Sequence, residues 1–117
     1  MIRYEVTLDV AGEGPLATLD AELAERLETY MRWQHIPEIL ATGCFADIRF
    51  DRAGPLRFRT VYHADAPADL DRYLAEHSPR LRADFAAHFP HGVTATREHW
   101  VELQRWERAD DIDDQEP

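Results

Sequence analysis

The stretch that decides the fold is Cys44-Phe-Ala-Asp-Ile-Arg-Phe50, Asp51-Arg-Ala-Gly-Pro55, Leu56-Arg-Phe-Arg-Thr-Val-Tyr62. Its two outer parts alternate apolar and polar side chains, which is typical of half-buried strands. The Gly-Pro pair between them indicates a turn. Residues 44–62 therefore predict a β-hairpin, and the segments on either side of it must complete the sheet.

A helix-breaking pattern occurs once on each side of the hairpin, as His35-Ile-Pro37 and as His77-Ser-Pro79. Proline lacks a backbone N–H and disfavours helical geometry in the residue before it, so each helix should kink or restart there. The first helix is expected over residues 19–35 with a continuation to Gly43, and the second from Pro67 to about Phe89. The repeat suggests a duplicated strand-helix unit whose helices bend at the same place.

Strands are predicted at both ends of this arrangement. Residues 2–10 alternate strictly, and residues 93–106 predict an unusually long final strand. The order is therefore β-α-β-β-α-β, the α+β class, in a ferredoxin-like sandwich with two kinked helices on one face of a four-stranded antiparallel sheet. The other face either meets water or packs against a second chain to form a dimeric α+β barrel.

Composition predicts one domain followed by an acidic tail. The chain has 117 residues and a formal charge of −10, and residues 107–117 hold six acidic side chains against one arginine. Such a segment buries too little apolar surface to offset its ordering entropy. Residues 1–106 are therefore expected to form the domain, and residues 107–117 a disordered tail.

Several classes of function are disfavoured by composition. No cluster of basic residues is present of the kind that nucleic-acid binding requires. Cys44 is the single cysteine, which excludes a disulfide within the chain and a cysteine-based zinc site. The start alternates polar and apolar residues, and no apolar run approaches the length of a membrane span. The expected location is the cytoplasm, without membrane or nucleic-acid partners.

Trp33, His35 and Glu38 form the sharpest local cluster of functional groups. As a catalytic group, His35 would serve as a proton carrier near neutral pH, Glu38 would fix its tautomer, and Trp33 would form an apolar wall for a ligand. The alternative is structural: Trp33 packs at the sheet edge, His35 caps backbone exposed by the kink, and Glu38 is solvated.

A second candidate cluster lies on the predicted open face of the hairpin, where Arg49, Arg59 and His63 share one parity. Converging arginines bind carboxylates or phosphates, and a histidine adds an acid or base. The alternative, which we favour, is pairing across strands with acids such as Asp47.

No metal site or cofactor is expected. A site built on His35 and His77 would need a third ligand, and no His-x-His or His-x3-His pair supplies one. No glycine-rich phosphate loop or nucleophile elbow occurs.

The segments Trp33-Gln-His35-Ile-Pro-Glu38-Ile-Leu-Ala-Thr-Gly43-Cys-Phe45 and Tyr73-Leu-Ala-Glu-His77-Ser-Pro-Arg-Leu-Arg-Ala83 resemble a family of small bacterial proteins, domain of unknown function 4286. The resemblance covers about residues 1 to 104 and leaves the acidic tail outside it. It implies a ferredoxin-like domain related to the dimeric α+β barrels, and it implies no established activity.

Three hypotheses for function follow, and they leave open whether the protein is an enzyme. The first is a homodimeric barrel, formed through the sheet faces and the last strand, that holds a small anionic or aromatic ligand. It would act as a binding protein or as a cofactor-independent enzyme with His35 or His63 as proton carrier. The second is a non-catalytic protein interaction module, and the third is a haem- or metal-binding barrel.

Overall fold

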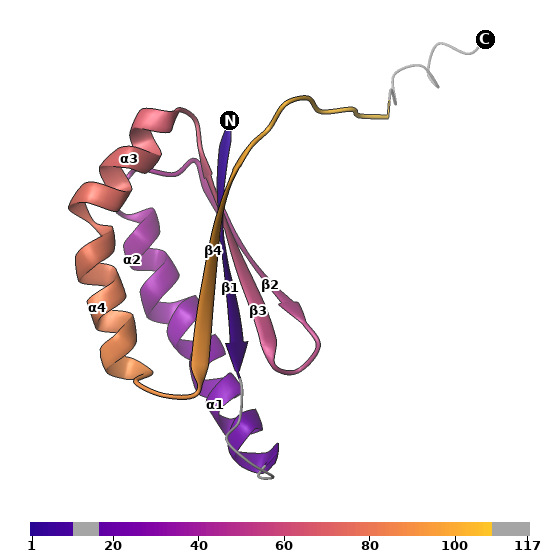
Figure 1. Ribbon diagram of the computed structural model, residues 1–117, viewed down its shortest axis with the longest axis vertical. Coiled ribbons are helices and arrows are strands. Elements are labelled where there is room, and N and C mark those ends of the chain that lie inside the picture. Colours follow the sequence, from indigo (N-terminus) through magenta and orange to yellow (C-terminus); the bar gives the residue numbers. More distant parts are fainter. Residues whose placement is uncertain (11–16, 109–117) are drawn as a thin grey trace.

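The structure is a computed structural model, and it describes residues 1–10 and 17–108. Within these two ranges, four strands and four α-helices follow the predicted order (Figure 1). The elements are β1 (Ile2–Val10), α1 (Ala17–Tyr30), the π-helical turn η1 (Met31–His35), α2 (Ile36–Leu40), β2 (Asp47–Ala53), β3 (Arg57–Ala64), α3 (Pro67–Glu76), α4 (Ser78–His88) and β4 (Val93–Val101). The run Gly12-Glu-Gly14-Pro15, which predicts a break after the first strand, lies outside the described residues, and so does most of the predicted acidic tail.

All strand pairs in the sheet are antiparallel, in the order β2-β3-β1-β4. Both helical segments lie on one face of this sheet, and none of the described helices covers the other face (Figure 1). The topology and layering are those of a ferredoxin-like α+β sandwich. The predicted fold class is therefore confirmed.

The core lies between the sheet and the helices. Because side chains alternate across a strand, one parity of each central strand faces the helices, and Tyr4 stands opposite Tyr62 on that side. Tyr4, Leu8, Phe58 and Tyr62 are all 3% exposed or less. The helices complete the core with further buried side chains, among them Leu27, Met31, Ile39 and Leu81.

The irregularity predicted at Pro37 takes the form of a π-helical turn. The N–H of Ile36 donates to the carbonyl of Met31, five residues earlier, so the helix widens by one residue before the proline. This turn carries the helical direction through to Leu40, instead of ending the helix at His35. In the second segment the break falls at His77, and Ser78 and Pro79 form the first turn of α4.

The hairpin strands are shifted from the predicted ranges. Cys44 and Phe45 are both buried and do not alternate, because they enter the core beneath α2, and the ladder of β2 begins only where Asp47 pairs with His63. Gly54 supplies the positive φ of the hairpin turn.

The last strand is shorter than predicted, ending at Val101 instead of residue 106. Val101 pairs with Ile2, where β1 begins, so the following residues have no strand beside them. Beyond this pair, the N–H of Glu102 donates a hydrogen bond to the carbonyl of Met1, the residue before β1. Residues 102–108 continue away from the sheet as an arm (Figure 1), with Leu103 and Trp106 exposed.

Candidate functional site

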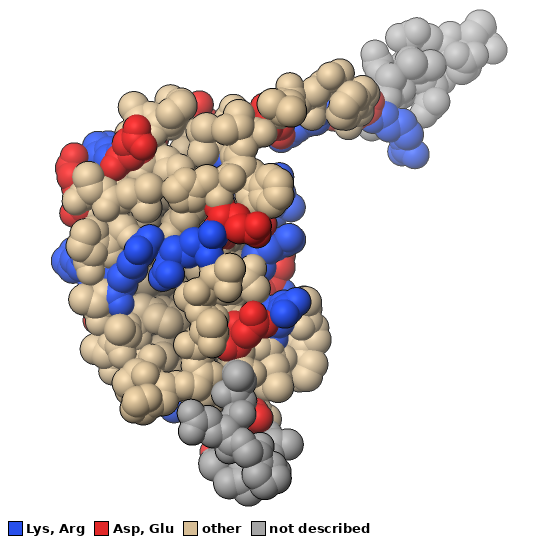
Figure 2. All heavy atoms as spheres, in the orientation of Figure 1, with Lys and Arg blue, Asp and Glu red and all other residues tan. Residues whose placement is uncertain are grey.

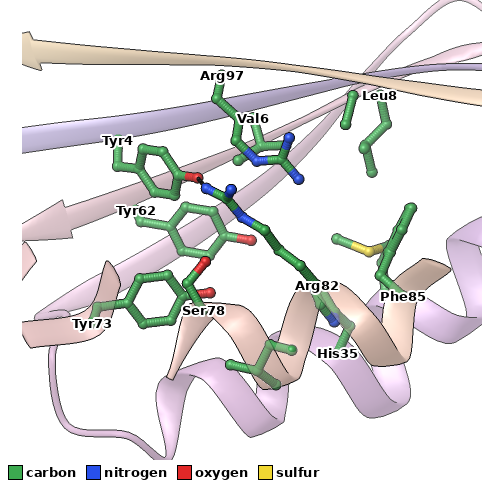
Figure 3. Close-up of a pocket in the computed structure, with 13 residues that line it drawn as sticks. Tyr4, Val6, Leu8, His35, Tyr62, Tyr73, Ser78, Arg82, Phe85 and Arg97 are labelled. Carbon is green, nitrogen blue, oxygen red and sulfur yellow. Dashed lines mark hydrogen bonds between the residues drawn. The ribbon is translucent and has the colours of Figure 1, made fainter. Parts of the chain in front are cut away.

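A pocket opens between α4 and the helix-facing side of the sheet, beside the turn η1 in the middle of the first helical segment (Figure 3). Its enclosed volume is about 30 Å³, which is room for about one water molecule. Strands β1, β3 and β4 line one side, α3 and α4 a second, and η1 the third. The polar side chains are Tyr4, His35, Tyr62, Tyr73, Ser78, Arg82 and Arg97.

Two arginines from different elements meet at this pocket. Arg82 extends from α4 towards the strands, and its guanidinium lies near that of Arg97 on β4 (Figure 3). Nη2 of Arg82 donates to the hydroxyl of Tyr4 at 3.2 Å. Among the described residues, neither arginine has a carboxylate partner.

The surface around the mouth is correspondingly basic. Figure 2 shows basic side chains in a line from α4 across to β4, and these are arginines because the sequence contains no lysine. Like charges held close together without an acid repel one another, so an anion placed between them lowers the electrostatic energy. The mouth therefore favours a negatively charged ligand.

Hydroxyl groups line the inner part of the pocket. Burial raises the pKa of Tyr62 and of Tyr73, so both hydroxyls keep their protons at ordinary pH. Ser78 Oγ is buried and has no hydrogen-bond partner among the described residues. A buried hydroxyl without a partner is costly, and a ligand or water in the pocket would supply the missing bond.

His35 lies at the floor of the pocket. The π-helical turn holds its ring over Tyr30, with the ring centroids 5.4 Å apart, and Phe85 lies 5.5 Å away on α4. Nδ1 of His35 is 3.4 Å from the hydroxyl of Tyr30. Burial lowers the pKa of His35 from 6.5 to about 4, and Arg97 adds to this effect while Asp84 opposes it. The ring is therefore neutral at pH 7.

Trp33 and Glu38 lie apart from this pocket. The side chain of Trp33 is 76% exposed and borders a shallow groove with Arg26 and Phe89 on the outer side of α1. Glu38 is exposed, and no hydrogen bond joins it to His35. Their roles as apolar wall and tautomer-fixing acid remain predictions.

Arg49, Arg59 and His63 lie on the opposite, helix-free face of the sheet, as their parity predicted. Arg59 pairs with Asp51 at 3.0 Å, and Nδ1 of His63 lies 2.5 Å from a carboxylate oxygen of Asp47. The pair of His63 with Asp47 is one that the sequence favoured, whereas Asp51 was expected in the hairpin turn. A ligand-binding role for Arg49, Arg59 and His63 stays a prediction. The sheet itself separates this face from His35.

Six polar residues of the pocket were missed in the sequence. Arg97 carried a usable signal, since it alternates with Val93 and Ala95 on the core-facing side of β4, where a charge is unexpected. The others gave none. Tyrosines and a serine at such positions are typical of an ordinary core, and an arginine on a helix is typical of a solvated surface. These residues are Tyr4, Tyr62, Tyr73, Ser78 and Arg82.

The described residues contain no group of three or more histidine, cysteine or acidic side chains that could hold a metal ion. None of the described helices is both long enough and apolar enough to cross a membrane. Cys44 is a buried free thiol.

The fold and the pocket together define a small ferredoxin-like α+β protein with a basic, hydroxyl-lined pocket between helices and sheet. The sequence model of the domain of unknown function DUF4286 matches residues 1–103, and the chain belongs to this family. The resemblance noted in the sequence is thereby confirmed.

Solved structures share the fold. One is a dimeric ferredoxin-like protein from an uncultured marine organism, with TM-score 0.60 and 14% identity over 90% of this chain and 97% of that one. Another, from Deinococcus radiodurans, is described as a putative antibiotic biosynthesis monooxygenase, with TM-score 0.54 and 16% identity over 92% of this chain and 98% of that one. None of the curated proteins matches the chain. At these identities the likeness shows the fold alone.

Proposed function

We propose that this protein binds a small anionic ligand in the pocket between α4 and the sheet. The observation that carries the proposal is the meeting of Arg82 and Arg97, without carboxylate partners among the described residues, above the buried unpaired hydroxyl of Ser78. Guanidinium groups bind carboxylates and phosphates through paired hydrogen bonds. The hydroxyl of Ser78 would bond a ligand oxygen that reaches further in.

Admission of a ligand larger than water requires Arg82 to move. The enclosed volume is about 30 Å³, and Arg82 crosses the pocket from α4 to the Tyr4 hydroxyl. Arg82 is exposed and has a long, flexible side chain, so it can swing outwards at small cost. A bound anion would then replace the Tyr4 hydroxyl as the partner of its guanidinium.

His35 gives this pocket a proton acceptor. Its neutral ring lines the same cavity as the two arginines, so a ligand held by them lies within reach of an unprotonated nitrogen. The arrangement supports a cofactor-independent proton transfer on the bound anion, in addition to simple binding. Trp33, Glu38, Arg49, Arg59 and His63 do not line this cavity.

The protein is further proposed to be a homodimer that packs through the helix-free sheet faces and the last strand. The fold likeness to a protein described as dimeric supports this. So does the apolar strip formed by Trp100, Val101, Leu103 and Trp106, whose side chains are 46% to 92% exposed. The same strip is the observation that favours the second candidate function, an interaction module for another protein. The cytoplasmic location remains a prediction.

The anion site is tested by ligand-dependent melting with benzoate and inorganic phosphate, each compared with sodium chloride at equal ionic strength. A site-bound anion at a hundred times its Kd stabilises the fold by about 2.7 kcal/mol, so the melting temperature of the wild type should rise. Arg97→Ala and Arg82→Ala should lose this rise. The matched control Arg59→Ala removes an arginine from the opposite face and should keep it.

Two results would overturn the proposal. In one, neither benzoate nor phosphate raises the melting temperature of the wild type above the chloride control. In the other, Arg59→Ala loses the response as fully as Arg97→Ala, which would place the anion on the helix-free face.

A further inference from the structure

Tyr30, His35 and Asp84 form a hydrogen-bonded chain that leads from α4 to the floor of the pocket. The hydroxyl of Tyr30 donates to Oδ2 of Asp84 at 2.5 Å and lies 3.4 Å from Nδ1 of His35. Nε2 of Gln34 donates to the same oxygen of Asp84 at 3.3 Å. The contact joins the first helical segment to α4.

The π-helical turn makes this chain possible. In an α-helix, side chains three or four residues apart share a face, but a π-helical turn brings positions five apart together. Tyr30 directly precedes this turn and His35 is its last residue, five positions later, and their rings lie at an interplanar angle of 28°. The turn that precedes Pro37 therefore places a hydroxyl beside the imidazole.

The hydrogens available among Tyr30, Asp84 and His35 determine which nitrogen of His35 is protonated. An ionised carboxylate only accepts hydrogen bonds, and Asp84 accepts from both Tyr30 and Gln34. The one hydroxyl proton of Tyr30 is thus engaged, and burial together with Asp84 raises the pKa of Tyr30, so that proton stays in place. Towards His35 the hydroxyl presents only a lone pair, which can bond Nδ1 only if Nδ1 carries hydrogen.

The other ring nitrogen is then the open one. Nε2 of His35 makes no hydrogen bond to any described residue. It is not one of the fully buried polar atoms without a partner, so it retains some exposure. The ring lines the pocket and Nδ1 is engaged beside the Tyr30 hydroxyl, which leaves Nε2 as the ring nitrogen available to a ligand. The charged and titratable groups acting on the ring are Asp84 and His88 from α4 and Arg97 from β4.

We infer that Asp84 and Tyr30 are positioning residues that hold His35 as the Nδ1–H tautomer, so that Nε2 accepts a hydrogen bond from the ligand. Every other polar group of the pocket can donate, from the two arginines to the hydroxyls of Tyr62, Tyr73 and Ser78. The pocket therefore selects an anion that also carries an O–H or N–H group. This ligand class rests on the proposed function, whereas the tautomer does not.

The tautomer is tested in the ligand-free protein by long-range ¹H–¹⁵N correlation spectra of the histidine rings at pH 7.5, with His35→Gln used to assign the signal. The wild type should show Nδ1 protonated and Nε2 unprotonated. Tyr30→Phe removes the acceptor, and Asp84→Ala frees the Tyr30 hydroxyl to donate to Nδ1. Both variants should shift the ring towards the Nε2–H tautomer, and the matched control Glu38→Gln should leave it unchanged.

The ligand class is tested by comparing benzoate with 2-, 3- and 4-hydroxybenzoate. A hydrogen bond of about 0.5–1.5 kcal/mol corresponds to a two- to tenfold tighter Kd for the isomer that reaches Nε2. Tyr30→Phe should lose this preference while still binding benzoate.

Each result decides one part of the inference. A wild-type ring protonated on Nε2, or a Glu38→Gln ring that changes tautomer, overturns the assignment. Hydroxybenzoates that bind no more tightly than benzoate overturn the ligand class. Failure of every anion to bind refutes the proposed function and with it the ligand class, while the spectra decide the tautomer independently.

Discussion

Lowering the pH should remove a defined part of the stability of this fold through His35. The ring is 8% exposed, and its burial lowers the folded-state pKa from 6.5 to about 4. Between these two values the unfolded chain binds a proton that the folded chain does not. The free energy of unfolding therefore falls as the pH is lowered from about 6.5 to about 4. The contribution of the neutral His35 ring to stability is fully present above pH 6.5.

The size of the effect follows from the shift. At 1.36 kcal/mol for each pKa unit, protonation of His35 should cost about 3 kcal/mol of unfolding free energy by pH 4. That is a large share of the roughly 5–15 kcal/mol that stabilises a typical domain.

Urea unfolding of the wild type and of His35→Gln at several pH values between 7.5 and 4 measures this difference. The variant loses ring contacts with Tyr30 and Phe85 at every pH, so the relevant quantity is the change in the wild-type advantage with pH. That advantage should shrink by about 3 kcal/mol from pH 7 to pH 4. His91→Gln, which removes an exposed histidine, should follow the wild type.

A constant difference between wild type and His35→Gln over this range would refute the reasoning, since it would mean that the folded and unfolded chains protonate His35 alike. Equal urea m-values for the two proteins are required for the comparison, because a changed m-value signals a change in the surface exposed on unfolding.

Two further predictions concern the core and the assembly. Leu81 is 1% exposed and packs on the sheet from α4, so Leu81→Ala should lower the free energy of unfolding, measured with urea, by about 2–5 kcal/mol. The control Ala87→Gly, at an exposed position of the same helix, should lower it by only about 1 kcal/mol. Equal losses in the two variants would contradict the assigned core. Light scattering should give a mass twice the 13.6 kDa of the monomer, and Trp100→Arg should weaken the dimer. A wild-type protein that is monomeric at all concentrations would exclude the sheet-face homodimer.

The local patterns predicted the secondary structure well where one face of an element is buried. Strict alternation over residues 2–10 predicted β1 to within the observed bounds, and the proline at residue 79 located the break between α3 and α4 to within two residues. Errors occurred where a neighbour decides the outcome. The last strand ends at Val101 because β1 offers no further partner, and no pattern within residues 93–106 carries that information.

The candidate site was predicted less completely, for the same reason. His35 was selected from the sequence because an imidazole beside a helix break is chemically conspicuous. Its hydrogen-bonded neighbours could not be selected: Asp84 is 49 positions away and reaches the site only because α4 packs against the first helical segment. Glu38 was nearer in sequence, but its side chain is exposed and makes no hydrogen bond with His35.

The sequence by itself determined the order of strands and helices, the parity of each strand, and the positions where proline disturbs a helix. These are properties of residues close together in the chain. The spacing of apolar side chains and the missing N–H of proline reveal them directly. The tertiary structure alone decided that Arg82 and Arg97 share one pocket and that Tyr30 stands between Asp84 and His35. Such contacts depend on the register between β1 and β4, the packing of α4, and a π-helical turn that adds one residue to the helix.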